Sequence, residues 1–166
     1  MNYMAFNKIS YGVYVVSSKD EYRPTGCVAN SVMQITAEPA TIAVSINKDN
    51  FTNKCIKDLK KFSISVLSEN TPPTIIGTFG YRSGKDFNKY EDLKTIWRDE
   101  LPIVASSCAY VTCELIDMME TQTHTVFLGK VLDADIISED KPMTYAYYHE
   151  VIKGKSPKNA PTYIPE

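Results

Sequence analysis

The sequence has few of the residues that usually carry metal or nucleophilic chemistry: four cysteines and two histidines among 166 residues. No two cysteines form a Cys-x-x-Cys pair, and Cys108 and Cys113 lie five residues apart in an expected strand, on opposite faces. We therefore expect free thiols and no metal site. The sequence also lacks a Gly-x-Ser-x-Gly elbow, a Walker loop and a Gly-x-Gly-x-x-Gly turn. Difficult chemistry would have to come from a bound cofactor.

Long apolar runs and an excess of charge are missing too. No apolar run is long enough to span a bilayer, and the net charge is only −2 at pH 7. The amino terminus lacks the basic and apolar segments of a secretory signal. We therefore expect a cytoplasmic protein of one domain that uses neither a membrane nor nucleic acid as a partner.

Strand patterns dominate what the sequence does contain. Runs rich in Val, Ile, Tyr, Phe and Thr predict strands over residues 12–18, 27–35, 41–47, 62–67, 105–116 and 124–137. The spacing of apolar residues predicts a helix over 51–59, and helices are also expected over 72–79 and 143–152. Many strands with few short helices indicate a mainly β fold, a closed or nearly closed barrel. Residues 1–152 would form this domain, and the polar, proline-rich residues 153–166 an extended tail that packs on a partner subunit.

Uncharged polar side chains lie on the strands before the first predicted helix. The strands carry Asn30, Ser31, Gln34 and Asn47, and the helix begins near Lys48, Asn50 and Thr52. The amide donors and the positive dipole end of a helix start favour an anion, so these residues suit a long polar ligand that ends in a phosphate. An ordinary capped helix with a solvated lysine is the alternative, and the carboxylate of Asp49 opposes an anion.

Two further segments could carry chemistry. Residues 79–90 combine glycines, aromatic residues and the cations Arg82, Lys85 and Lys89, which suit a phosphate and a planar ring; the alternative is a solvated loop. His124 opens a predicted strand among threonine hydroxyls, and a hydrogen-bonded polar residue is the alternative to a functional one.

Taken together, these segments resemble the flavin reductase-like family of FMN-binding split barrels. Within it, the resemblance is to the group that holds an archaeal ferric reductase and the amino-terminal flavin domain of high-molecular-weight rubredoxins. The matching stretches follow family order from residue 8 to 163: KISYGVYVVSS, GCVANSVMQIT, IAVSINKDNFT, SVLSENTPPTIIGTFGYRSGKDFNKY, THTVFLGKVLDA and TYAYYHEVIKGKSPKNAPTY. THTVFLGKV together with the NKDNFT turn is a fairly specific combination, although either alone would be weak.

The resemblance implies a split β-barrel of Greek-key topology, with FMN at a homodimer interface. His124 would orient the nicotinamide or the flavin ring. The family pattern often has Thr or Ser where this chain has Cys27 and Val28, so contacts there would come from backbone amides. The implied cofactor-binding residues are Cys27, Val28, Ala29, Asn30, Ser31, Gln34, Asn47, Lys48, Asn50, Thr52, Arg82, Ser83 and Lys89.

The implied activity is an FMN-dependent oxidoreductase that passes electrons from NAD(P)H to free flavin, a ferric complex, rubredoxin or oxygen. The alternative is a flavoredoxin-like electron carrier that NAD(P)H reduces poorly. No rubredoxin-type Cys-x-x-Cys pairs are present, so a rubredoxin partner is expected to be a separate protein. The choice between NADH and NADPH, the acceptor, the role of Cys27 and the retention of FMN through turnover stay open.

Overall fold

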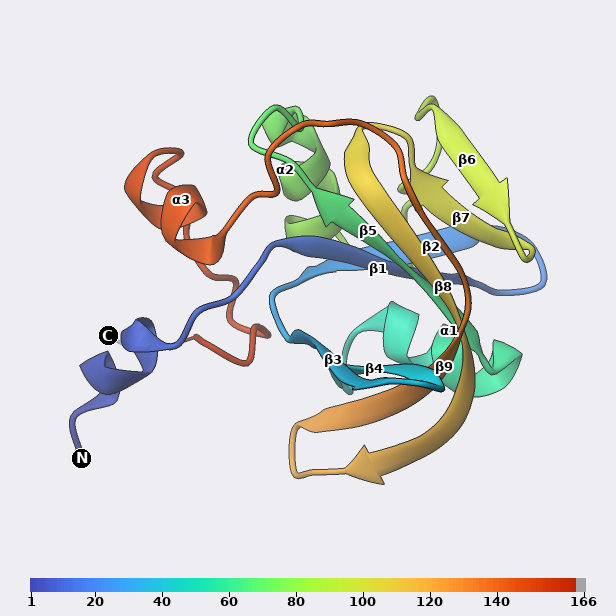
Figure 1. Ribbon diagram of the computed structural model, residues 1–166, viewed down its shortest axis with the longest axis horizontal. Helices are drawn as coiled ribbons and strands as arrows, with labels where there is room; N and C mark the ends of the chain where they lie inside the picture. The colour runs from blue at the N-terminus through green and yellow to red at the C-terminus, as the bar shows by residue number, and fades with distance from the viewer. Residues whose placement is uncertain (164–166) are drawn as a thin grey trace.

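Seven antiparallel strands form the main sheet of the computed structural model, which describes residues 1–163 (Figure 1). The sheet order is β2-β1-β5-β8-β9-β4-β3, and a separate hairpin pairs β6 with β7. The strands are β1 (Tyr14–Lys19), β2 (Pro24–Ala29), β3 (Val32–Ala37), β4 (Ala40–Asn47), β5 (Lys61–Leu67), β6 (Thr95–Arg98), β7 (Leu101–Val104), β8 (Ser107–Glu120) and β9 (His124–Ile136). The helices are η1 (Tyr3–Lys8, a 3-10 helix), α1 (Phe51–Leu59), α2 (Pro73–Tyr81) and α3 (Tyr145–Glu150).

A two-residue link forces the sheet to curl into a barrel. β2 and β3 are the outer strands of the sheet, yet only Asn30 and Ser31 connect them, and this link reaches at most roughly 11 Å. Ser31 is held against β4 because its hydroxyl donates to the Ser45 carbonyl (2.7 Å) and its own carbonyl accepts from the Ser45 amide (3.1 Å). The expected mainly β barrel with a few short helices is confirmed. The single strand predicted over 27–35 is wrong, because the chain changes sheet edge at this link.

The helix α1 has the predicted bounds. Its apolar residues Cys55 and Ile56 are buried, and the helix packs against β1 and β2. Asn50 is the N-cap, with its side-chain oxygen accepting a hydrogen bond from the Thr52 amide (3.3 Å). The other two helices were expected in place, although α2 runs two residues further than predicted and α3 is shorter at both ends.

The hairpin of β6 and β7 was not predicted. Its turn residues Asp99 and Glu100 both have positive φ, a conformation that the sequence signals only weakly without glycine. All four residues of β7 are buried, and the strand packs over β1 and β5. The hairpin therefore covers one side of the barrel (Figure 1).

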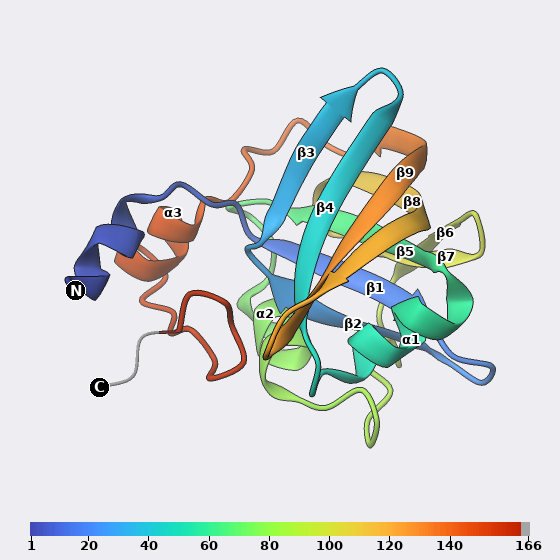
Figure 2. The ribbon, with the colours of Figure 1, turned by 90° about the horizontal axis from the view of Figure 1, so that it is seen from below.

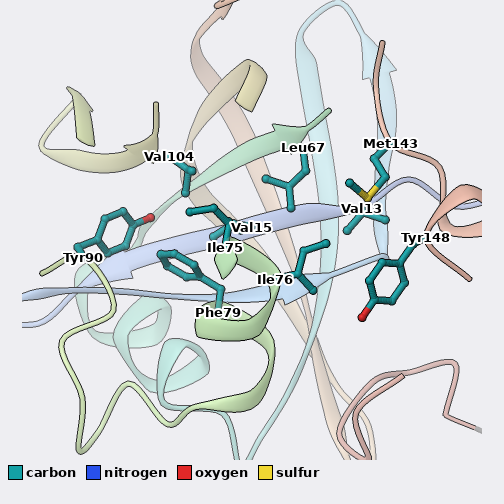
Figure 3. Close-up of a cluster of buried hydrophobic side chains, with 10 residues drawn as sticks. All are labelled: Val13, Val15, Leu67, Ile75, Ile76, Phe79, Tyr90, Val104, Met143 and Tyr148. Atoms are coloured by element: carbon teal, nitrogen blue, oxygen red, sulfur yellow. The ribbon is translucent and has the colours of Figure 1, made fainter. Parts of the chain in front are cut away.

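Two apolar clusters stabilise the fold. One fills the barrel, where Gly129 on β9 lies so close to Phe62 and Cys113 that an added Cβ would come within 2.5 and 2.7 Å of them. The other lies between α2, β1, β5 and the segment that leads into α3, from Tyr90 at one end to Tyr148 at the other (Figure 3). Among residues 1–163, no helix is both long and apolar enough to cross a membrane.

Candidate functional site

A cavity of about 350 Å³ lies between the body of the barrel and the tail that follows α3. Its walls come from the ends of β2 and β4, the start of α1, the end of α2 with its following loop, and residues 155–161 of the tail. The lining residues are Val13, Cys27, Val28, Ala29, Asn30, Ser45, Ile46, Asn47, Asp49, Asn50, Phe51, Ile76, Phe79, Gly80, Tyr81, Arg82, Ser83, Lys89, Tyr145, Tyr148 and 155–161. A volume in this range is typical of cofactor and small-molecule sites.

One wall of the cavity combines a helix start with an arginine. The Asn47 side chain accepts from the Asp49 amide (2.9 Å) and Asn50 caps α1, so the turn before this helix is fixed by its own side chains. The Arg82 guanidinium lies 4.6 Å from the centroid of the Phe87 ring, which holds it beside Ser83. The N–H groups of the first helical turn and a guanidinium both favour an anionic ligand.

Lys89 brings a buried positive charge to the same cavity. It is only 4% exposed, and its ammonium donates to the carbonyls of Gly26 (2.7 Å) and Phe79 (3.1 Å). Among residues 1–163, no carboxylate lies within ion-pair distance of it. Burial lowers the pKa of the Lys89 ammonium. A bound anion would stabilise the charged form, so Lys89 favours a phosphate-bearing ligand.

Several polar atoms in and near the cavity lack hydrogen bonds in the described part of the chain. The Asn30 amide is 5% exposed, and its Oδ1 is buried without a partner. The hydroxyl oxygens of Thr25 on β2 and Thr52 on α1 are also buried without a hydrogen-bond partner in the described part of the chain. Because buried polar groups normally find partners, the Asn30 Oδ1 is free to accept a hydrogen bond from a ligand hydroxyl or ring N–H.

Cys27 also lines the cavity, and it belongs to the buried cluster inside the barrel. Burial raises the pKa of this thiol, and the nearby Lys89 charge opposes that rise. The thiol is therefore protonated near neutral pH and behaves as a small apolar group.

The charge of the lining contrasts with that of the whole protein. Arg82, Lys89, Lys155 and Lys158 line the cavity, with Asp49 as the only carboxylate among the lining residues. The complete chain has a net charge of −2. Positive charge is thus concentrated at this cavity, as expected for a polyanionic ligand.

The structure brings nine of the predicted site residues together in the lining. They are Cys27, Val28, Ala29, Asn30, Asn47, Asn50, Arg82, Ser83 and Lys89.

Five predicted residues lie outside this lining. Ser31 bonds to β4, Gln34 is exposed on β3, and Thr52 is buried in the first turn of α1. Lys48 forms an ion pair with Glu120 (3.1 Å) at the end of β8. These four residues do not line the cavity of this chain, so their roles in cofactor binding stay predictions.

His124 is the fifth of these residues. It pairs with the lining residue Asn47 across β4 and β9, and its Nδ1 lies 2.8 Å from the Thr123 hydroxyl. Its Nε2 is buried and has no partner among residues 1–163. This nitrogen therefore has an unused hydrogen-bonding capacity next to the cavity lining.

Sequence reasoning placed Tyr81 in an aromatic, cationic loop but missed the contribution of Tyr145, Tyr148 and tail residues 155–161. Tyr145 and Tyr148 are three residues apart in YAYYHE, a helical spacing that places them on one face. That spacing was the available signal for Tyr145 and Tyr148. Nothing in the composition of the tail indicates that it returns to cover a cavity.

The sequence is similar to a known protein family and to several characterised proteins. Residues 6–155 match the family model described as "Flavin reductase like domain". The chain is 41% identical over 165 residues to the high molecular weight rubredoxin of Moorella thermoacetica, covering 98% of this chain and 72% of that protein. It is 37% identical over 166 residues to the ferric-chelate reductase (NAD(P)H) of Archaeoglobus fulgidus, covering 99% and 98%.

A solved structure shares the fold. The NADH:FAD oxidoreductase of Streptomyces globisporus C-1027 superposes with a TM-score of 0.77 at 23% identity, covering 84% of each chain. Together with the family match over most of the sequence, this agreement leads to one conclusion. The chain belongs to the flavin reductase-like family.

Proposed function

We propose that this protein is an FMN-dependent oxidoreductase that passes electrons from NAD(P)H to an acceptor. The observation that carries the proposal is the cavity wall where a helix start, Arg82 and the unpaired buried Lys89 meet. Two relatives support it by name, since one is a ferric-chelate reductase that uses NAD(P)H and another an NADH-dependent FAD reductase.

The residues present fit FMN. Arg82, Ser83 and the first turn of α1 would hold the phosphate, and Lys89 would complete its charge balance. The orphaned Oδ1 of Asn30 would accept from a hydroxyl or a ring N–H, while Val28, Ile46 and Phe79 supply apolar surface for a ring. When bound, FMN supplies the hydride and electron chemistry, which the side chains of this protein do not provide.

The protein's own part is to bind, orient and exclude water. The lining holds no carboxylate–histidine pair, and the protonated Cys27 is not a nucleophile at neutral pH. We therefore assign no acid or base, and we infer that positioning and charge neutralisation are the contributions of this chain. His124 is proposed as an orienting residue for the nicotinamide or the flavin ring; it lies at the start of β9, paired with the lining residue Asn47.

A homodimer is part of the proposal. Apolar side chains are exposed on β3, β8 and β9, which lie with β4 in the half of the sheet seen at the front of Figure 2. They are Met33, Ile35, Ile116, Met118, Met119, Leu132 and Ile136. A second copy would cover this surface. Light scattering after gel filtration would give twice the chain mass for the wild type, and Met119→Glu would shift it toward the monomer; a monomeric wild type would contradict the proposal.

The first test is a visible spectrum of the purified protein, followed by anaerobic addition of NADH or NADPH. A yellow protein that bleaches within seconds supports the oxidoreductase. A colourless protein that also fails to take up added FMN would remove the flavin proposal.

The same titration tests an electron carrier as the second candidate. The relative with 41% identity is named a high molecular weight rubredoxin, which supports a redox protein as an electron-exchange partner. A yellow protein that neither nucleotide bleaches would support the carrier. Free flavin, a ferric chelate, rubredoxin and oxygen would then be compared as acceptors.

A further inference from the structure

The tail after α3 forms part of the cavity wall. The chain after α3 turns back toward the barrel (Figure 2). All seven of residues 155–161 line the cavity. Among them are Lys155 and Lys158, which make up half of the cationic lining residues. Neither lysine has a carboxylate within ion-pair distance in the described part of the chain. The tail therefore presents two uncompensated charges to a ligand.

Tyrosines hold the tail in this position. The hydroxyls of Tyr81 (2.5 Å) and Tyr148 (3.3 Å) both donate to the Lys155 carbonyl. Tyr145 hydrogen-bonds to Ser156, and the Thr162 hydroxyl donates to Tyr145 (3.0 Å) while accepting from the Asn30 amide (2.9 Å). The backbone beside Lys155 is thus fixed by residues that themselves line the cavity.

The two pairs of cations come from separate elements. Lys89 is fixed between β2 and α2 by two carbonyls, and Arg82 lies on Phe87. Lys155 and Lys158 belong to the tail and depend on α3 and Asn30 for their position. One phosphate carries a charge of about −2 near pH 7, which matches the first pair alone. Lys155 and Lys158 are therefore free to bind a second anionic group.

The neighbours of these lysines indicate the class of ligand. Tyr81, Tyr145 and Tyr148 line the cavity next to the tail, and the rings of Tyr145 and Tyr148 are stacked with their centroids 6.2 Å apart. Aromatic rings beside cations suit a planar base attached to phosphate groups. No residue from 153 to 163 is buried, so the tail can open for a ligand that enters and leaves in every turnover.

We propose that Lys155 and Lys158 bind the phosphate groups of the pyridine nucleotide, so that the tail is the nucleotide-recognition element of the cavity. This inference rests on the proposed oxidoreductase function. It adds a binding site for the electron donor that is separate from the FMN phosphate wall.

The test compares two double variants with the same change of charge. Lys155→Gln with Lys158→Gln removes the proposed site, whereas Lys8→Gln with Lys153→Gln removes two exposed lysines outside the lining. We expect the first to raise the KM for NADH or NADPH about tenfold at unchanged kcat, and to weaken the salt dependence of kcat/KM. FMN affinity should stay within about twofold of wild type, and the control should match wild type throughout.

A direct binding measurement accompanies the kinetics. Lysine acetylation followed by mass spectrometry would be run on FMN-loaded protein with and without NADP⁺. We expect NADP⁺ to slow modification of Lys155 and Lys158 but not of Lys153.

The outcomes separate this inference from the function on which it rests. A protein that takes up no FMN would overturn the proposed function. A protein that binds FMN and is reduced, but whose tail variant keeps its KM and shows no NADP⁺ protection, would overturn the inference alone. Protection by ferric citrate instead of NADP⁺, or loss of FMN affinity in the tail variant, would also overturn it, because the lysines would then serve the acceptor or the FMN phosphate.

Discussion

The two walls of the cavity are built in different ways. The body wall comes from β2, β4, α1 and α2, where Cys27, Ile46 and Phe79 are buried and Lys89 is fixed by two carbonyls. The tail wall has no buried residue between 153 and 163, and polar contacts to tyrosines and Asn30 hold it in place. The body wall is continuous with the core of the barrel, whereas the tail wall is attached to the barrel by polar contacts.

This difference between the walls is the physical basis of the proposal that one cavity serves two ligands. Elements that share the core open only with global unfolding, whereas segments without apolar burial open at low free energy. A rigid wall suits a ligand that stays bound, and a loosely held wall suits a ligand that exchanges. The predictions below test this contrast and the packing and charge pairing around it, beginning with the largest expected effect.

Lys89→Met should remove the strongest charge interaction of the body wall. We expect FMN affinity to fall roughly 100-fold, because a buried charge-assisted contact is worth about 2–3 kcal/mol. Flavin fluorescence titration measures this loss. Riboflavin, which lacks the phosphate, is the control and should lose little affinity.

The pH dependence sharpens the same prediction. Burial lowers the pKa of Lys89 in the free protein, and a bound phosphate would raise it again. The preference for FMN over riboflavin should therefore be complete below the lowered pKa and should decline as pH rises through it. In Lys89→Met this decline should be absent; an unchanged pH profile in the variant would contradict the assignment.

Gly129→Ala tests how tightly the barrel behind the body wall is packed. An added methyl would meet Phe62 and Cys113 at 2.5 and 2.7 Å, so we expect the free energy of unfolding to fall by about 1–3 kcal/mol. Chemical denaturation measures it. Gly77→Ala is the matched control: nothing lies within 4 Å of its added methyl inside α2, so it should stabilise the protein by about 0.5–1 kcal/mol. Equal effects at the two positions would contradict the packing argument.

Deletion of residues 153–166 tests the tail wall. Because none of residues 153–163 is buried, we expect the free energy of unfolding to change by less than about 1 kcal/mol. FMN binding should persist, whereas the KM for the nucleotide should rise. A cooperative loss of folding on deletion would show that the tail belongs to the core after all, and the contrast between the walls would fail.

Glu120→Gln should have the smallest effect. Hydrogen bonds and ion pairs with Lys57 and Lys48 lower the pKa of this exposed carboxyl to about 2. Its contribution to stability is therefore present above the ordinary pKa of a glutamate and is lost as pH falls toward 2. Thermal unfolding should show a small difference between wild type and variant at pH 7 that disappears near pH 2. A difference that persists at that pH would contradict the ion-pair explanation.

Local signals explain which parts of the fold could be predicted. The bounds of α1 followed from Phe51, Cys55, Ile56 and Leu59 and from the Asn50 cap, all within one segment. No glycine or proline marks the break between β2 and β3 at Asn30 and Ser31. It could not be predicted because it depends on the position of β3 at the other edge of the folded sheet. The turn at Asp99 and Glu100 was missed for a similar reason, since its positive φ values are imposed by the buried strand β7.

The site residues also divide into those that have a local sequence signal and those that depend on long-range contacts. Asn47 and Asn50, which line the cavity, were predicted because polar residues at strand and helix ends are visible in sequence, whereas Arg82 and Lys89 were predicted from a cationic loop and from the family resemblance. Lys48 also lies beside the predicted helix start, between β4 and α1, but it pairs with Glu120, which lies 72 residues further along the chain. Which lysine reaches the cavity depends on long-range pairing, and no local pattern encodes it.

The link at Asn30 and Ser31 also bears on how the protein acquires its cofactor. Neighbouring strands β8 and β9 are joined by three residues and can pair early, whereas the pairing of β4 with β9, such as Ser45 with Val126, joins distant parts of the chain. Asn30 lines the cavity, and its neighbour Ser31 bonds to β4. We therefore expect the ligand site to form late in folding, so that flavin binds to the assembled barrel. Flavin would then stabilise the finished barrel by mass action, and its supply would influence how much of the newly made protein survives proteolysis.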